Sequence, residues 1–207
     1  MKKVIIFDMM GVIFKDGDDT NDLLVPYVKS LFPHIKRNYI VEKCMAASLG
    51  KITASEFWVS LGVKKEDVAS VQNHYLDTYL KFNESFLDCV KVLSQKYRIA
   101  ILSNDVGAWN EYLRNYYGFE KYIEKAFISS DLKCRKPDPN IYKIAINELG
   151  IEPWEGIFID DSSERVEVAE RIGLTGIVFA EEKKEYLGLQ VQTFSEIIHL
   201  CMPNMIK

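Results

Sequence analysis

Polar side chains that could do chemistry follow several short apolar runs in this sequence of 207 residues. A carboxylate ends the first run, a Ser-Asn-Asp sequence ends another, and a pair of carboxylates ends a later one. These residues are Asp8, Ser103, Asn104, Asp105, Asp160 and Asp161. If the runs are parallel strands, the side chains meet at the carboxyl edge of one sheet, which is where open α/β sheets bind ligands.

Carboxylates that meet at one edge repel each other, and each raises the pKa of the others unless a cation neutralises them. Oxygen ligands with no His or Cys nearby favour Mg²⁺, whose octahedral shell is completed by water and substrate phosphate. Lys136, in a polar loop over residues 133–139, and the hydroxyl of Ser103 could hold such an anion. A carboxylate aligned with phosphorus can act as a nucleophile. The residue types therefore indicate a magnesium site that binds a phosphate.

Short apolar runs alternate with segments of helical spacing, which is typical of an α/β fold with a doubly wound, Rossmann-like parallel sheet. The expected strands cover residues 4–7, 99–102, 126–128, 157–159 and 177–180. Asp138 before Pro139 predicts the start of a helix that Gly150 ends, and Asp161 with Glu164 could cap another helix.

The interval between the first two expected strands is too long for one crossover helix, because the strand signal after Asp8 comes only near Arg98. Helical spacing of apolar residues fills this interval. We therefore expect a small helical second domain over residues 16–84, inserted into an α/β core of residues 1–15 and 85–207. The aromatic residues of the insertion are expected to form its own hydrophobic core.

Composition excludes several classes of protein. The 26 basic and 30 acidic residues give a net charge of −4 without a basic stripe, so nucleic acid is not an expected partner. The longest apolar runs have about four residues, whereas a membrane span needs ~20. The N-terminal residues show no secretory pattern and the four Cys form no C-x-x-C pair, so we expect a cytoplasmic protein with reduced thiols. The oligomeric state is not predicted.

Four segments resemble, in order, the motifs of the haloacid dehalogenase-like (HAD) hydrolase superfamily. They are Phe7-Asp8-Met9-Met10-Gly11-Val12-Ile13, Ile101-Leu102-Ser103-Asn104, Lys136-Pro137-Asp138-Pro139 and Phe158-Ile159-Asp160-Asp161-Ser162. The insertion is similar to the helical cap domain of subclass I, in which the cap follows the first motif. The third motif, with Ile141-Tyr142 after it, resembles the sugar-phosphate phosphatase branch.

This resemblance implies a phosphatase that acts on a small phosphorylated metabolite through an aspartyl-phosphate intermediate. Asp8 is the implied nucleophile. Ser103, Asn104 and Lys136 are the implied phosphate-binding residues, and Lys136, also catalytic, would lower the pKa of Asp8. Mg²⁺ is the implied cofactor. Its implied ligands are Asp8, the main-chain carbonyl of Met10, Asp161, and Asp160 either directly or through water.

Met10 departs from the phosphatase pattern, which has at this position a second Asp that protonates the leaving alcohol and later activates water. Loss of that group should slow alkyl-phosphate hydrolysis by roughly 10²–10⁴. An aryl or acyl phosphate would need little protonation, and a cap residue or one of Asp16, Asp18 and Asp19 could supply a substitute acid. Otherwise the protein is a weak or inactive binder of phosphate and metal.

A 2-haloacid dehalogenase is the third hypothesis. Dehalogenases of the superfamily also lack the second Asp, because displacement of halide from carbon needs no acid. Asp160 and Asp161 argue against this activity, since they retain a capacity for metal that attack on carbon does not require.

Overall fold

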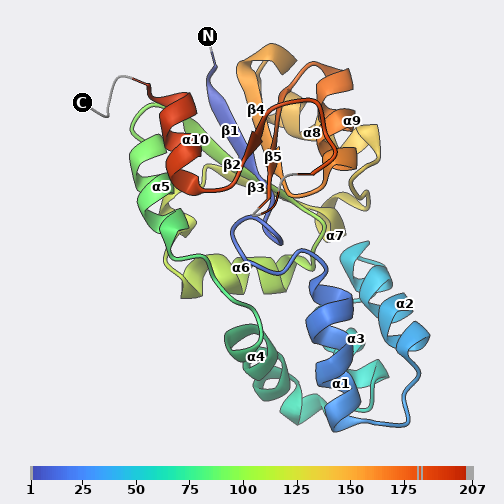
Figure 1. Cartoon of the computed structure of the whole chain (residues 1–207). Helices are drawn as coiled ribbons and strands as arrows, with labels where there is room; N and C mark the ends of the chain where they lie inside the picture. The colour runs from blue at the N-terminus through green and yellow to red at the C-terminus, as the bar shows by residue number, and fades with distance from the viewer. Residues whose placement is uncertain (1, 181, 183, 204–207) are drawn as a thin grey trace.

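The computed structural model describes residues 2–180, 182 and 184–203. Within these residues, a six-stranded sheet has the order β3-β2-β1-β4-β5-β6, and every adjacent pair of strands is parallel. The strands are β1 (Val4–Phe7), β2 (Arg98–Ser103), β3 (Lys125–Ile128), β4 (Gly156–Asp160), β5 (Thr175–Phe179) and β6 (Gln190–Val191). The predicted doubly wound parallel sheet is confirmed, with β6 as a short addition that the sequence did not predict (Figure 1).

β1 lies in the middle of the sheet because all of its residues are apolar and buried. Val4 is in register with Arg98 of β2 on one side and with Gly156 of β4 on the other. Alternate residues of β1 belong to two different hydrophobic clusters, one on each face of the sheet. The strand order reverses at β1, so the carboxyl ends of β1, β2 and β4 form the switch point at which such sheets bind ligands.

Helices cover both faces of the sheet, with α5 and α10 packed on one face and α8 and α9 on the other (Figure 1). The helices that follow the insertion in the chain are α5 (Ser85–Leu93), α6 (Gly107–Tyr116), α7 (Ser129–Leu132), α8 (Pro139–Leu149), α9 (Ser163–Ile172) and α10 (Phe194–Cys201). All four cysteines are free thiols, as predicted. In the part of the chain that the structure describes, every helix is too short or too polar to cross a membrane.

The two predicted helix starts have different outcomes. α8 begins as predicted, since the Asp138 carboxylate accepts a hydrogen bond from the N–H of Asn140 at 2.9 Å and Gly150 ends the helix with a φ of 63°. The predicted capping role of Asp161 is wrong, because Ser162 is the N-cap residue of α9. Asp161 belongs instead to an acidic cluster described below.

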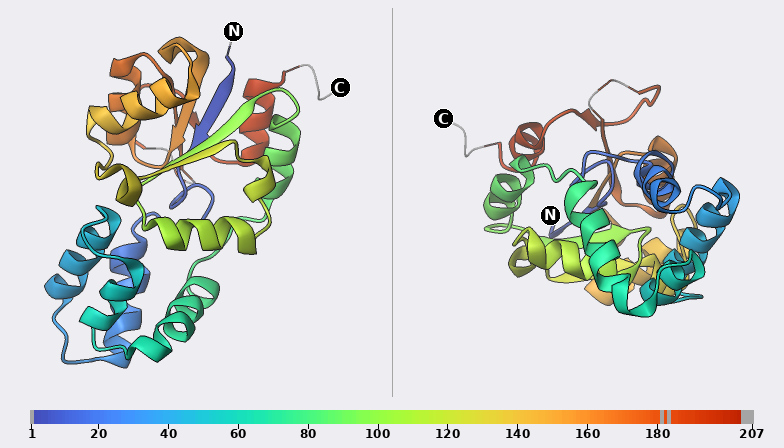
Figure 2. Two further views of the ribbon diagram at one scale, coloured as in Figure 1. Left: turned by 180° about the vertical axis from the view of Figure 1, so that it is seen from behind. Right: turned by 90° about the horizontal axis from the view of Figure 1, so that it is seen from below.

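Helices α1 (Val25–Leu31), α2 (Arg37–Ser48), α3 (Ala54–Ser60) and α4 (Val68–Thr78) lie between β1 and β2 in the chain. They stand beyond the carboxyl ends of the strands (Figures 1 and 2). The two segments that connect them to the sheet run side by side. Lys15 N–H donates to the carbonyl of Lys81, and Asn83 N–H donates to the carbonyl of Ile13, both at 2.9 Å. The inserted helices therefore face the sheet edge at which Asp8 lies.

The aromatic residues of the insertion form a core that is continuous with the core of the sheet. Tyr27, Trp58 and Tyr75 pack together, with ring centroids 5.5–6.1 Å apart. Trp109 of α6 enters the same group, with its ring 5.9 Å from that of Trp58 and 6.2 Å from that of Tyr75. The inserted helices and one face of the sheet thus share a single buried cluster.

Candidate active site

Asp8 lies just beyond β1 and is only 2% exposed. Its N–H donates to the carbonyl of Ile159 at 2.8 Å, which extends the pairing of β1 with β4. Its Oδ1 accepts a hydrogen bond from the N–H of Met9 at 2.7 Å. A tight turn follows, in which the carbonyl of Met9 accepts from the N–H of Phe14 at 2.9 Å. These backbone bonds fix the carboxylate at the sheet edge.

Lys136 brings a buried positive charge to this carboxylate. Its Nζ lies 2.8 Å from Oδ1 of Asp8 and 2.6 Å from Oδ2 of Asp160. Asn104 holds the main chain of Lys136 from the end of β2, because its side-chain amide both accepts from the N–H and donates to the carbonyl of Lys136, each at 2.8 Å. The side chain of Asn104 therefore positions Lys136, and its predicted contact with phosphate stays a prediction.

Asp160 and Asp161, at the end of β4, complete an acidic cluster with Asp8. One carboxylate oxygen from each of the three residues lies within 4.8 Å of the other two. Asp160 is fully buried, and its Oδ1 accepts from the N–H of Ser162 at 2.9 Å. Asp161 is partly exposed, but its Oδ1 is buried and has no hydrogen-bond partner. The structure thus brings together the carboxylates that the sequence placed at one edge.

Arg165 also reaches this cluster, and the sequence analysis missed it. Its Nη1 lies 3.2 Å from Oδ2 of Asp8, 3.4 Å from Oδ1 of Asp160 and 3.7 Å from Oδ1 of Asp161. The residue is in the first turn of α9, four positions after Asp161. Asp161 precedes the N-cap residue Ser162, so the spacing of side chains within a helix does not account for this contact, and the sequence carries no local signal for it.

Burial and charge act in opposite directions on these groups. Burial, together with the neighbouring charge of Asp160, raises the pKa of Asp8 to about 7. Lys136 opposes this shift but does not outweigh it, so the expectation that Lys136 lowers the pKa of Asp8 holds for its own contribution and not for the net shift. Burial also acts against ionisation of Asp160, but Lys136 and Arg165 outweigh burial and lower its pKa. A divalent cation beside Asp8 would favour its ionised form.

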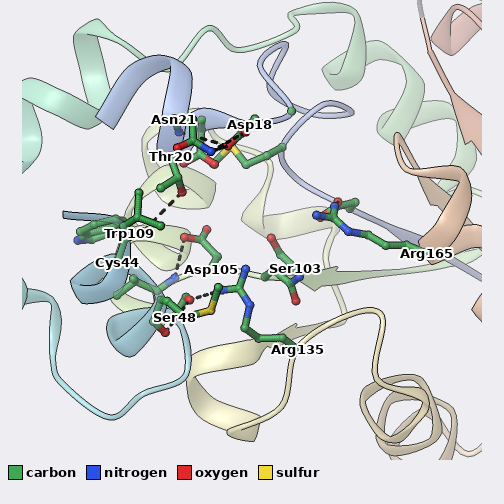
Figure 3. A pocket seen from close by; sticks show the side chains of 18 residues that line it. Asp18, Thr20, Asn21, Cys44, Ser48, Ser103, Asp105, Trp109, Arg135 and Arg165 are labelled. Atoms are coloured by element: carbon green, nitrogen blue, oxygen red, sulfur yellow. Dashed lines mark hydrogen bonds and ion pairs between the residues drawn. The ribbon is translucent and has the colours of Figure 1, made fainter. Parts of the chain in front are cut away.

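A cavity of about 190 Å³ opens between Asp8 and the inserted helices. Figure 3 shows Arg165 and Trp109 on opposite sides of it, with Ser103 and Arg135 between them. The further residues that line it include Met10, Asp18, Asp19, Thr20, Cys44, Ser48, Asn104 and Asp105. Arg135, whose guanidinium donates to the hydroxyl of Ser48 on α2, was not predicted. The size and polarity of the cavity suit a small polar ligand.

Several of the residues predicted to bind phosphate or to act as an acid line this cavity. Ser103, the last residue of β2, lines it, and so does Met10, which is 8% exposed. Of the three carboxyls considered as substitute acids, Asp18 and Asp19 line the cavity. Burial, with repulsion from Asp105, raises the pKa of Asp19 to about 7, so a substantial fraction of this carboxyl is protonated at neutral pH.

The acidic cluster fits a divalent cation. Oδ1 of Asp161 is buried and accepts no hydrogen bond, and carboxylate oxygens are the ligands that Mg²⁺ prefers. Gly11 is required for this geometry, because a Cβ there would lie 2.5 Å from Cγ of Asp161. A carboxylate, a lysine and a cation site beside a polar cavity can together bind and transfer a phosphoryl group.

The sequence of the chain is similar to curated enzymes of two activities. It is 26% identical over 133 residues to D-ribitol-5-phosphate phosphatase of Bacteroides thetaiotaomicron, a match that covers 60% of this chain and 65% of that protein. It is 28% identical over 123 residues to (S)-2-haloacid dehalogenase 4A of Burkholderia cepacia, covering 56% of this chain and 53% of that protein. The chain thus spans between half and two thirds of the length of these relatives.

The fold is similar to that of the HAD family enzyme BT-2542 from Bacteroides thetaiotaomicron, solved in complex with magnesium and inorganic phosphate. The TM-score is 0.72 at 24% sequence identity, and the match covers 89% of this chain and 98% of that one. The family model for haloacid dehalogenase-like hydrolases matches residues 2–173. With that match over most of its length, the chain belongs to the haloacid dehalogenase-like hydrolases.

Proposed function

We propose that this chain is a magnesium-dependent phosphatase that acts on a small phosphorylated metabolite through a phosphoryl intermediate on Asp8. The observation that carries this proposal is the placement of the Asp8 carboxylate at the head of the cavity, 2.8 Å from the ammonium of Lys136 and in one cluster with Asp160 and Asp161. Two similar proteins support the same activity: D-ribitol-5-phosphate phosphatase, and the HAD family enzyme that was solved with magnesium and inorganic phosphate. The predicted cytoplasmic location rests on the sequence alone.

In the proposed reaction, a carboxylate oxygen of Asp8 attacks phosphorus while the bond from phosphorus to the leaving oxygen breaks. Lys136 balances the charge of the phosphoryl group, and the hydroxyl of Ser103 donates a hydrogen bond to it. Mg²⁺, held by Asp8, Asp160, Asp161 and the carbonyl of Met10, would neutralise the charge that brings two anions together. Water then attacks phosphorus, which releases inorganic phosphate and restores the carboxylate.

Met10 limits which substrates can react. Its thioether lines the cavity but has no proton for a leaving alkoxide, so the leaving group must depart as a stable anion. We therefore infer that aryl or acyl phosphates react faster than alkyl phosphates. Asp19, which lines the same cavity, is the candidate acid if alkyl phosphates do react.

A protein that binds phosphate and metal without turnover is the second candidate, since the same cluster could hold both ligands without completing the reaction. A haloacid dehalogenase is the third candidate, favoured by Met10 because attack on carbon with departure of halide needs no acid. The similarity to (S)-2-haloacid dehalogenase 4A is compatible with it.

The test compares wild type with Asp8→Asn on an aryl phosphate, a sugar phosphate and a 2-chloro acid, each with Mg²⁺ and with a chelator. We expect wild type to hydrolyse the aryl phosphate only with Mg²⁺ and Asp8→Asn to lose at least 10³-fold in kcat, about 4 kcal/mol. Asp88→Asn, which alters an exposed carboxyl on α5, is the matched control. Phosphate binding without turnover would establish the second candidate, and halide release without metal would establish the third.

A further inference from the structure

Arg165 approaches the oxygens of the acidic cluster that are least occupied by other donors. Oδ1 of Asp8 already contacts Lys136 and the N–H of Met9, whereas the Oδ2 contact in the structure is with Arg165 at 3.2 Å. The orphaned Oδ1 of Asp161 lies 3.7 Å from the same Nη1. The guanidinium therefore lies where a cation shared by these oxygens would lie.

A guanidinium and Mg²⁺ cannot share this position. Mg²⁺ binds carboxylate oxygens at about 2.0–2.1 Å in a near-octahedral shell. Nη1 of Arg165 lies 3.2–3.7 Å from the same oxygens, so it occupies the space that an ion bound to them on this side would need. Two cations so close together repel strongly, because Asp8 and Asp160 are buried and solvent screens the charges around them only weakly. Entry of the metal thus requires Arg165 to move.

The charges make this exchange favourable when the metal is available. Three carboxylates opposed by Lys136 and Arg165 leave one negative charge unbalanced, whereas the same carboxylates opposed by Lys136 and a dication are neutral. The side chain of Arg165 is 26% exposed, so it has access to solvent, and it lines the cavity in front of Asp8. A displaced guanidinium thus has room on the wall of the same cavity.

We propose that Arg165 is a resident counter-cation of the acidic cluster and that Mg²⁺ binds by displacing it. This inference rests on the proposed metal site and adds that metal affinity is lowered by the cost of moving Arg165. Without metal, Lys136 alone does not balance the three carboxylates, and buried charges that are not balanced destabilise the folded protein. The guanidinium of Arg165 reduces this imbalance.

The test measures Mg²⁺ affinity by titration calorimetry and the thermal midpoint with and without Mg²⁺, neither of which depends on turnover. Arg165→Met keeps the aliphatic stem and removes the charge. Arg171→Met is the matched control, since Arg171 lies on the same helix, is exposed and pairs with Glu167. We expect Arg165→Met to bind Mg²⁺ at least tenfold more tightly than wild type, and Arg171→Met to bind it as wild type does.

The thermal midpoint should respond in a matching way. Without metal, Arg165→Met should unfold at a lower temperature than wild type, and Mg²⁺ should raise its midpoint by more than that of wild type. Asp161→Asn added to Arg165→Met should remove the gain in affinity, which locates the ion in this cluster. Equal affinity in wild type and Arg165→Met would overturn the inference and leave the metal site in place. Absence of Mg²⁺ binding in both proteins would instead reject the metal of the proposed function, and the inference with it.

Discussion

At the scale of single residues, position 10 decides how much of the reaction the chain can complete. Met10→Asp places a carboxyl two residues after the nucleophile, on the wall of the cavity where a leaving group would lie. We expect this substitution to raise kcat for a sugar phosphate by roughly 10²–10⁴, the usual contribution of a general acid. Turnover of an aryl phosphate should change only a few-fold, because its leaving group needs no proton.

Steady-state kinetics on both substrates measures this difference. Met9→Asp is not a suitable control, because Met9 is fully buried and a carboxylate there would destabilise the fold. The double variant Asp8→Asn, Met10→Asp should be inactive on both substrates, which assigns any gain to the Asp8 pathway. If wild type already hydrolyses both phosphates equally well, the prediction is contradicted. Asp19→Asn would then test whether Asp19 is the acid that replaces the missing one.

Asp19 gives a prediction for stability against pH. Its pKa is raised to about 7 in the folded protein by burial and by Asp105. An unfolded Asp has a pKa of about 3.9, so between these values the folded state binds the proton more tightly. The free energy of unfolding should therefore fall as the pH rises from about 4 to about 7, by the linkage between proton binding and stability.

Asp19→Asn removes this titration. We expect the variant to be more stable than wild type by about 1 kcal/mol at pH 8, less than full linkage would give because the side chain is partly exposed. The difference should vanish near pH 4, where the wild-type carboxyl is protonated. Urea unfolding at both pH values measures it, with Asp88→Asn as control, and a difference that is independent of pH would refute the assignment.

At the scale of elements, the sequence predicted best where one local pattern determines the structure. The apolar runs predicted β1, β2, β3, β4 and β5, because parallel strands that are covered on both faces are typically continuous apolar segments. β6 was missed because Gln190–Val191 is too short to show any periodicity. The Asp138-Pro139 start of α8 needed only local chemistry, whereas the role of Asp161 was decided by tertiary contacts that bring it to Asp8.

The candidate site was also predicted only where a local pattern indicates the position of a residue. Asp8, Asp160 and Asp161 were found because residues at the carboxyl ends of parallel strands must meet. Lys136, which lies in the loop between α7 and α8, was found from that polar loop and from the third motif. Arg165 was missed because an Arg in the first turn of a helix ordinarily faces solvent. Whether its guanidinium turns inward depends on the distance between α9 and β1, which no local pattern encodes.

The turn after β1 gives a prediction with a close internal control. Gly11 has a φ of 80° and would place a Cβ 2.5 Å from Cγ of Asp161, whereas Gly118 has a φ of 73° and open space around it. Gly118→Ala should cost about 1 kcal/mol for the left-handed conformation alone. Gly11→Ala should cost clearly more, because Asp161 must also move.

The same pair of variants separates stability from metal binding. Gly11→Ala should weaken Mg²⁺ binding by displacing Asp161, and Gly118→Ala should leave the Mg²⁺ affinity unchanged. Urea unfolding and calorimetric titration measure the two quantities. Equal losses of stability in both variants would mean that the approach of the turn to Asp161 is not tight.

At the scale of the whole molecule, the inserted helices are joined to the sheet by contacts on two sides of the cavity. On the α2 side, the hydroxyl of Ser129 donates to the carbonyl of Ser48 at 2.6 Å, and Lys133 donates to the carbonyl of Gly50 at 2.9 Å. On the α4 side, Nε1 of Trp109 donates to Oε1 of Gln72 at 2.6 Å. These contacts hold the inserted helices against the cavity in front of Asp8, so the position of the insertion affects what the cavity admits.

Trp109 connects the two parts most extensively, because its indole packs against rings of the inserted helices while its backbone belongs to α6. Trp109→Ala should therefore lower the free energy of unfolding by about 3 kcal/mol or more, as expected for loss of a buried aromatic side chain. It should also raise KM, since Trp109 lines the cavity. Trp154, 61% exposed, offers the matched control, and Trp154→Ala should change stability by less than about 0.5 kcal/mol. If urea unfolding gives the two alanine variants equal stability, the shared cluster does not couple the insertion to the sheet, and the aromatic residues of the insertion form an independent core after all.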